Sequence, residues 1–124
     1  MSYIGRMLRI DLTDQKTMKE ELSREFFESY LGGRGIGAKI LFDELEPKTD
    51  PFSPENMIIF STGTLGGTFA PASARLTVTS KSPETNLYCK TTVGGHFSPE
   101  LKFAGYDCIV VSGASQEPVY VNIK

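Results

Sequence analysis

Arg75 stands between a loop of small residues and an alternating segment, a position suited to holding an anion. Residues 70–74 read Ala-Pro-Ala-Ser-Ala, and small side chains let a ligand come close to the backbone. Arginine adds a planar fork of donors that fits a phosphate or the edge of a heterocycle. The alternation predicts that Arg75 shares the polar face of a strand with Thr77 and Thr79. An exposed strand arginine without a ligand is the alternative.

A second anion site is predicted at Gly94-Gly95, between an expected strand and a short helix. Free amides and the helix dipole attract phosphate there, and paired glycines let it approach. The helix is expected to have Ser98 as its cap, Pro99 at its first position and Gly105 at its end. A sharp turn without a ligand is the alternative. His96, the single histidine of the chain, is expected to be structural.

Residues 33–38 match the G-x-G-x-x-A pattern of dinucleotide-binding loops. That pattern requires a preceding strand, whereas residues 26–31 have helical spacing. The segment therefore predicts a tight corner between two helices in which a glycine takes a positive φ. The alternative is that Arg34 and nearby amides face an anion.

The first half of the chain predicts a hairpin followed by two helices. Residues 8–12 and 18–22 alternate between apolar and polar side chains and flank a polar turn. Ser23 is expected to cap a helix that Gly32 ends. A second helical pattern must stop before Pro47.

The second half predicts short strands separated by loops. They comprise a buried strand with two apolar faces at 57–60, the Arg75 strand, and strands at 87–93, 108–111 and 119–123. The expected fold is α+β, a β-sheet platform of hairpins and short strands with interspersed helices.

The composition and a few sequence patterns argue against several classes of function. A net charge of −2 over 124 residues argues against nucleic acid as a partner. No signal-like or membrane-spanning stretch is visible, so the cytoplasm is expected. Cys89 and Cys108 are expected to be reduced, partly buried thiols, with too few companions for a zinc or iron–sulfur site. Glu100 and Asp107 are expected to be helix-end or solvent charges.

Long stretches of the sequence resemble one family. They are GRMLRIDLT, YLGGRGIGAKILFDEL, DPFSPENMIIFSTGTLGGTFAPASARLTVTSKSP, VGGHFSPELKFAGYDCIVVSG and EPVYVNIK. In this order they resemble the amino-terminal, cofactor-binding domain of the tungsten-containing aldehyde:ferredoxin oxidoreductases. The resemblance implies that residues 1–124 are the N-terminal part of the pterin-cofactor-binding domain of a much longer enzyme.

The resemblance also implies a cofactor and its contacts. The cofactor is a tungsten, or molybdenum, ion held by two pterin dithiolenes whose phosphates are linked through magnesium. Arg75 matches the family's pterin-contacting arginine, and Gly94 and Gly95 match the glycine pair that contacts the pterin through the backbone. Thr92 stands where asparagine is frequent and would meet magnesium through its carbonyl oxygen. No catalytic residue is expected within the chain.

The implied full enzyme oxidises aldehydes to carboxylic acids and passes electrons to ferredoxin. Its [4Fe-4S] cluster would be bound by the missing C-terminal part, so this chain alone is expected to be inactive. The expected partners are the other domains of the same enzyme and ferredoxin, and a homo-oligomer is compatible with the resemblance. Two alternatives remain: a stand-alone cofactor-carrier or assembly subunit, and a generic phosphate- or nucleotide-binding module.

Overall fold

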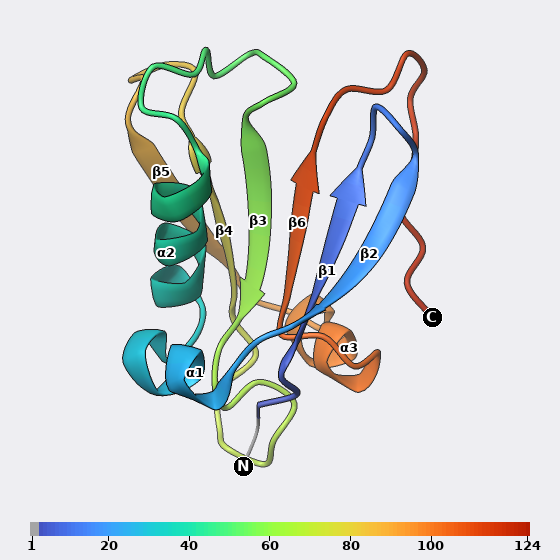
Figure 1. Ribbon diagram of the computed structural model, residues 1–124. Helices are drawn as coiled ribbons and strands as arrows, with labels where there is room; N and C mark the ends of the chain where they lie inside the picture. Colours follow the sequence, from blue (N-terminus) through green and yellow to red (C-terminus); the bar gives the residue numbers. More distant parts are fainter. Residues whose placement is uncertain (1–2) are drawn as a thin grey trace.

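The fold is built on one mixed sheet, in which a pair of strands and a group of three strands are joined by one strand between them. The computed structural model describes residues 3–124, which form a six-stranded sheet in the order β2-β1-β6-β3-β4-β5 together with three helices (Figure 1). The strands are β1 (Arg6–Asp11), β2 (Lys16–Glu21), β3 (Met57–Thr62), β4 (Leu76–Lys81), β5 (Tyr88–Val93) and β6 (Cys108–Ser112). The helices are α1 (Arg24–Tyr30), α2 (Arg34–Glu44) and α3 (Phe97–Phe103). The predicted α+β class is confirmed.

The strand pairing brings distant parts of the chain to one end of the sheet. β1 forms the predicted antiparallel hairpin with β2 and pairs in parallel with β6. β3 is antiparallel to both β6 and β4, and β4 is antiparallel to β5. Leu76 lies opposite both Thr62 and Val93. The ends of β3 and β5 and the start of β4 are therefore neighbours.

α1 and α2 cover one face of the sheet. The Ser23 side chain accepts a hydrogen bond from the backbone N–H of Phe26, which confirms the predicted cap of α1. α2 packs on β3 and β4. The core on this side consists of Met7, Phe27, Ile36, Ile40, Leu41, Met57, Ile59, Cys108 and Val110.

The polar face predicted for β4 is buried under α2, so that part of the prediction is wrong. Thr79 has no exposed surface and Thr77 is 7% exposed. Glycine in the helix permits this contact, because a Cβ at Gly37 would lie 2.5 Å from Thr79 Oγ1. Threonine packs its methyl group well in such a layer, which the polar pattern does not reveal.

α3 lies against the other face, near one end of the sheet (Figure 1). His96 occupies the N-cap position without a side-chain capping bond. Ser98, predicted as the cap, is instead inside the helix and 1% exposed, so this prediction is wrong. The helix begins two residues earlier than the serine and proline suggested. Its end beside Gly105, which has φ 93°, agrees with the expected stop.

The strand predicted at 119–123 is absent from the part of the chain that the structure describes. The segment runs across the face that carries α3 without pairing to the sheet. Its alternating residues Val119, Val121 and Ile123 line a groove on that face. Alternation therefore identified the apolar side of the segment correctly, but a strand also requires a pairing partner. None of the helices described between residues 3 and 124 has the length and apolar character needed to cross a bilayer.

Candidate functional site

Arg75 directly precedes β4 and is exposed. Its Nη1 donates a hydrogen bond of 3.4 Å to Thr92 Oγ1 on the neighbouring strand β5. No ion pair to Arg75 is found among residues 3–124. The guanidinium thus keeps most of its donors, and all of its charge, available for an anion.

Gly94 and Gly95 follow β5 at the same end of the sheet. Because Val93 lies opposite Leu76, the next pair in the register brings Gly94 beside Arg75. A Cβ added to either glycine would meet no atom within 4 Å, and Gly95 has φ 125°. The backbone here is open to a ligand, and the conformation of Gly95 disfavours any other residue. The fold therefore brings together all four sequence-predicted positions: Arg75, Thr92, Gly94 and Gly95.

The corner at residues 33–38 is structural, as the favoured interpretation predicted. Gly33 has φ 49°, and its N–H donates to the carbonyl of Thr62 at 2.8 Å. The amides of Gly35 and Gly37 donate to backbone carbonyls within the corner. These three amides are already paired, so they offer little to the anion of the alternative interpretation. A Cβ at Gly35 would lie 2.1 Å from the Tyr30 oxygen.

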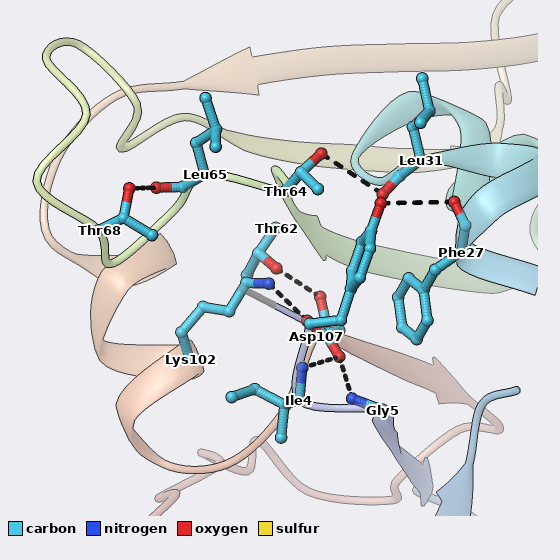
Figure 2. A network of polar contacts seen from close by, with 11 residues as sticks. Ile4, Gly5, Phe27, Leu31, Thr62, Thr64, Leu65, Thr68, Lys102 and Asp107 are labelled. Atoms are coloured by element: carbon cyan, nitrogen blue, oxygen red, sulfur yellow. Dashed lines mark hydrogen bonds and ion pairs between the residues drawn. The ribbon is translucent and has the colours of Figure 1, made fainter. Parts of the chain in front are cut away.

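A buried polar network, missed by sequence reasoning, supports the same end of the sheet. Asp107 is 1% exposed, so its predicted place as a solvent charge is wrong. Its carboxylate accepts hydrogen bonds from the amides of Ile4 and Gly5 at 2.9 and 2.7 Å, and pairs with Lys102 Nζ at 2.5 Å (Figure 2). Thr62 Oγ1 donates to the Asp107 carbonyl at 2.9 Å. The available signal was that Asp107 directly precedes an apolar run.

Glu100 is exposed, as expected. His96 is also exposed and makes no capping bond. Within residues 3–124 no three histidine, cysteine or acidic side chains are grouped so as to hold a metal ion. Any metal at the site would therefore depend on backbone oxygens or on another ligand.

The two cysteines differ sharply in environment. Cys108 is fully buried in the sheet, and burial raises the pKa of its thiol to about 12. Cys89 lies exposed on the edge strand β5, so the prediction of a partly buried thiol is wrong for Cys89. Edge position explains the error, because both faces of β5 are open to solvent.

Comparisons with known proteins identify relatives along nearly the whole chain. Residues 7–124 match the family model "Aldehyde ferredoxin oxidoreductase, N-terminal domain". The tungsten-containing aldehyde ferredoxin oxidoreductase of Pyrococcus abyssi is 47% identical over 98% of this chain and 20% of its own length. The WOR-like subunit of the aliphatic sulfonate oxidoreductase of Pyrococcus furiosus is 38% identical over 98% of this chain and 20% of its own length.

A solved structure has nearly the same fold. It is the active site complex BamBC of benzoyl coenzyme A reductase with 1,5-dienoyl-CoA, with a TM-score of 0.96 and 43% identity. The match covers 98% of this chain and 19% of that one. The chain thus spans about a fifth of the length of the curated relatives that it matches.

Proposed function

The chain belongs to the aldehyde ferredoxin oxidoreductase family as its N-terminal domain, and on that premise we propose that it is the cofactor-binding portion of a tungsten, or molybdenum, pterin oxidoreductase. The full enzyme would oxidise aldehydes to carboxylic acids with ferredoxin as the electron acceptor. One observation supports the location of the cofactor: Arg75, which has no ion pair among the described residues, lies beside the open Gly94-Gly95 turn.

The residues present fit a pterin dithiolene with anionic phosphates. A planar cation suits a phosphate or a heterocycle edge, and side-chain-free backbone lets the group approach closely. Arg75 would bind the anionic part, while Gly94 and Gly95 would contact the pterin through their backbone. The Thr92 hydroxyl accepts a hydrogen bond from Arg75 and so restrains it. The Thr92 carbonyl is the proposed contact for magnesium, which prefers oxygen ligands.

When bound, the metal and its pterins supply the two-electron chemistry by which an aldehyde and water give a carboxylic acid, two protons and two electrons. The residues of this chain hold and orient the cofactor. Arg75 balances the charge of its phosphates. Residues outside this chain would bind the substrate and a [4Fe-4S] cluster that relays electrons to ferredoxin. The other domains of the same polypeptide are the immediate partners, and the cytoplasm is the proposed location.

The test is metal and pterin analysis of the full-length protein purified without oxygen. Inductively coupled plasma mass spectrometry should find tungsten or molybdenum together with magnesium, and oxidative release should give a fluorescent pterin. Neither metal and no pterin in folded protein would contradict the proposal. Aldehyde-dependent reduction of a viologen dye should accompany the metal.

A second candidate function comes from the benzoyl coenzyme A reductase complex, which is nearly as similar, at 43% identity, as the aldehyde oxidoreductase at 47%. The same cofactor-binding site could then serve the interconversion of an aromatic CoA thioester and its cyclic dienoyl form. Assays of one metal-loaded preparation with aldehydes and with dienoyl-CoA separate the two. Turnover of dienoyl-CoA alone would replace the aldehyde proposal and keep the cofactor proposal.

A further inference from the structure

Arg34 is a basic residue to which the proposed function gives no role. It is the first residue of α2 and is exposed. The backbone amides of this corner are already paired, but no hydrogen bond or ion pair of the Arg34 side chain is found among residues 3–124. Arg9 and Arg24, by contrast, each pair with a carboxylate. The guanidinium of Arg34 therefore keeps its charge and its full set of donors for another group.

Contacts between α2 and the sheet place Arg34 at the end that carries Arg75. α2 starts where β3 ends (Figure 1), and the N–H of Gly33 donates to the Thr62 carbonyl at 2.8 Å. A Cβ on Gly33 would lie 3.1 Å from Thr77 Oγ1. Arg34 follows Gly33 with a Cα spacing of about 3.8 Å, and Arg75 precedes Thr77 by two residues, about 7 Å of extended chain. The two arginines therefore flank one contact between α2 and β4.

The side of α2 on which Arg34 lies faces β5. Arg34 begins a stripe of one helix face with the spacing i, i+4, i+7 and i+11. The later members of the stripe share one groove with the start of β5, lined by residues that include Ala38, Leu41, Leu45, Leu87 and Tyr88. α2 crosses β4 in the direction of that strand, because its successive glycines meet Thr77 and then Thr79. Since β5 is antiparallel to β4, the start of the stripe, Arg34, lies toward the end of β5.

Arg75 and Lys90 lie on the face of the sheet that α2 covers. Thr77 is on that face, and alternation along the chain puts Arg75 on the same side. In the register, Thr92 lies opposite Thr77 and Lys90 lies opposite Thr79, so both β5 residues share the face. The hydrogen bond from Arg75 to Thr92 agrees with this placement. Lys90 is exposed and has no ion pair among residues 3–124.

Three cations, Arg34, Arg75 and Lys90, thus form a basic face at this end of the sheet. The chain as a whole has a formal net charge of −2, so the cluster is a local feature. Like charges brought together repel, and no ion pair within residues 3–124 offsets any of the three. Arginine offers a planar fork that matches phosphate, and lysine adds a point charge. A phosphate group would therefore offset this repulsion and satisfy the free donors.

We propose that the basic face binds a phosphate group, with Arg34 and Arg75 as its two arginine ligands and Lys90 as a further positive charge. The inference rests on the proposed function, in which the ligand is a phosphate of the cofactor. A CoA thioester, the substrate class of the second candidate function, would bring phosphate to the same three residues. Recognition has the same chemistry for both sources, and the experiment distinguishes them.

The test follows the cofactor in the full-length protein. Arg34→Ala should speed the loss of metal and pterin during dialysis about tenfold, because it removes a charge-assisted hydrogen bond, and Arg34→Lys should restore part of the retention. In the double variant Arg34→Ala/Arg75→Ala, the effect should be smaller than the product of the two single effects, since both arginines bind one group. Arg24→Ala is the matched control and should retain the cofactor. A double effect equal to the product would overturn the shared phosphate site.

Kinetics distinguish the two sources of phosphate. Unchanged retention in Arg34→Ala, together with a raised KM for dienoyl-CoA and an unchanged KM for aldehydes, would support the site with the substrate as its source. Unchanged retention together with unchanged KM values would overturn the site. A lower unfolding temperature as the only effect of Arg34→Ala would assign Arg34 to a carboxylate elsewhere in the polypeptide, and would also overturn it.

Inorganic phosphate provides a test that does not depend on the cofactor. In full-length protein without metal or pterin, phosphate should raise the unfolding temperature of the unmodified protein more than that of Arg34→Ala, at an ionic strength matched with chloride. An equal rise in the two proteins would overturn the phosphate site. This measurement can be made whether or not metal and pterin are found, so failure of this inference is distinguishable from failure of the proposed function.

Discussion

Arg75 and its neighbours illustrate what individual residues reveal in a sequence. The glycine pair at 94–95 is a local feature of the sequence, so the open backbone at these two residues could be predicted. The hydrogen bond from Arg75 to Thr92 depends on the register of β4 and β5, which local patterns do not determine. The residues of the candidate site could thus be predicted individually, whereas their mutual contacts could not.

Replacing Arg75 should reduce cofactor retention with little effect on folding. A lost charge-assisted hydrogen bond costs about 1.5–3 kcal/mol, which weakens binding about tenfold or more. In full-length protein, Arg75→Ala should therefore lower the tungsten and pterin content per polypeptide, measured by mass spectrometry and fluorescence. Arg24→Ala, an exposed arginine paired with Glu28 on α1, is the control. Full cofactor content in Arg75→Ala would refute the assigned contact.

Cys108 should make the stability of the chain depend on alkaline pH. Burial raises its pKa from 9.0 to about 12, so the folded state keeps a proton that the unfolded state loses. The contribution of this thiol to the free energy of unfolding is fully present below about pH 9. Between the unfolded pKa of 9.0 and the folded pKa of about 12, it falls by about 1.4 kcal/mol per pH unit. Urea unfolding at pH 8, 9 and 10 should show a shallower decline for Cys108→Ala than for the unmodified chain.

Cys89→Ala is the matched control, since Cys89 is exposed. Its pH dependence should follow that of the unmodified chain. Identical slopes for the unmodified chain and Cys108→Ala would contradict the effect of burial.

At the scale of elements, hydropathy patterns predicted most helices and strands but not what covers them. The β1–β2 hairpin and the two helices before Pro47 follow from alternation, capping and proline chemistry. The patterns failed where burial or strand pairing depends on contacts with other elements. Thr77 and Thr79 lie beneath a glycine-bearing helix, and residues 119–123 have no strand beside them among the described residues. Neither outcome is encoded within a single segment.

A side chain at Gly35, in the corner between α1 and α2, should destabilise the fold. Alanine normally stabilises a helix relative to glycine by about 0.5–1 kcal/mol. Here its Cβ would lie 2.1 Å from the carbonyl oxygen of Tyr30, a backbone atom that cannot rotate away. Gly35→Ala should therefore lower the free energy of unfolding by about 1–3 kcal/mol in urea titrations.

Gly63→Ala provides the comparison, because no atom lies within 4 Å of the added Cβ. Its free energy of unfolding should stay within about 0.5 kcal/mol of the original value. An equal effect of the two substitutions would show that the corner yields more readily than its geometry indicates.

At the scale of the molecule, the Asp107 network joins parts that no single segment connects. Its bonds link the N-terminal residues Ile4 and Gly5, the end of β3 at Thr62, the α3 residue Lys102 and the residue before β6 (Figure 2). The network lies at the end of the sheet that carries the proposed cofactor site. We expect it to keep that end rigid.

Lys102→Met should destabilise the chain strongly. It would leave the buried carboxylate of Asp107 without its cation, which typically costs about 3–5 kcal/mol. Urea unfolding of the 124-residue chain measures the loss. Lys16→Met removes an exposed pair with Asp14 and should change stability by less than about 1 kcal/mol. Adding Asp107→Asn to Lys102→Met should recover part of the loss; comparable small losses in both lysine variants would rule out a structural role for the buried pair.

The position of β6 has a consequence for how the protein is made. Among the strands described within residues 3–124, β6 comes last in sequence, yet it lies between β1 and β3. While the nascent chain leaves the ribosome, the β1–β2 hairpin and the β3–β4–β5 unit have no strand to join them. Until residues 108–112 emerge, β1 and β3 each keep an edge of unpaired backbone N–H and C=O groups. Such non-local pairing slows folding and favours aggregation of incomplete chains, so translation rate and chaperone supply should govern the yield of folded protein.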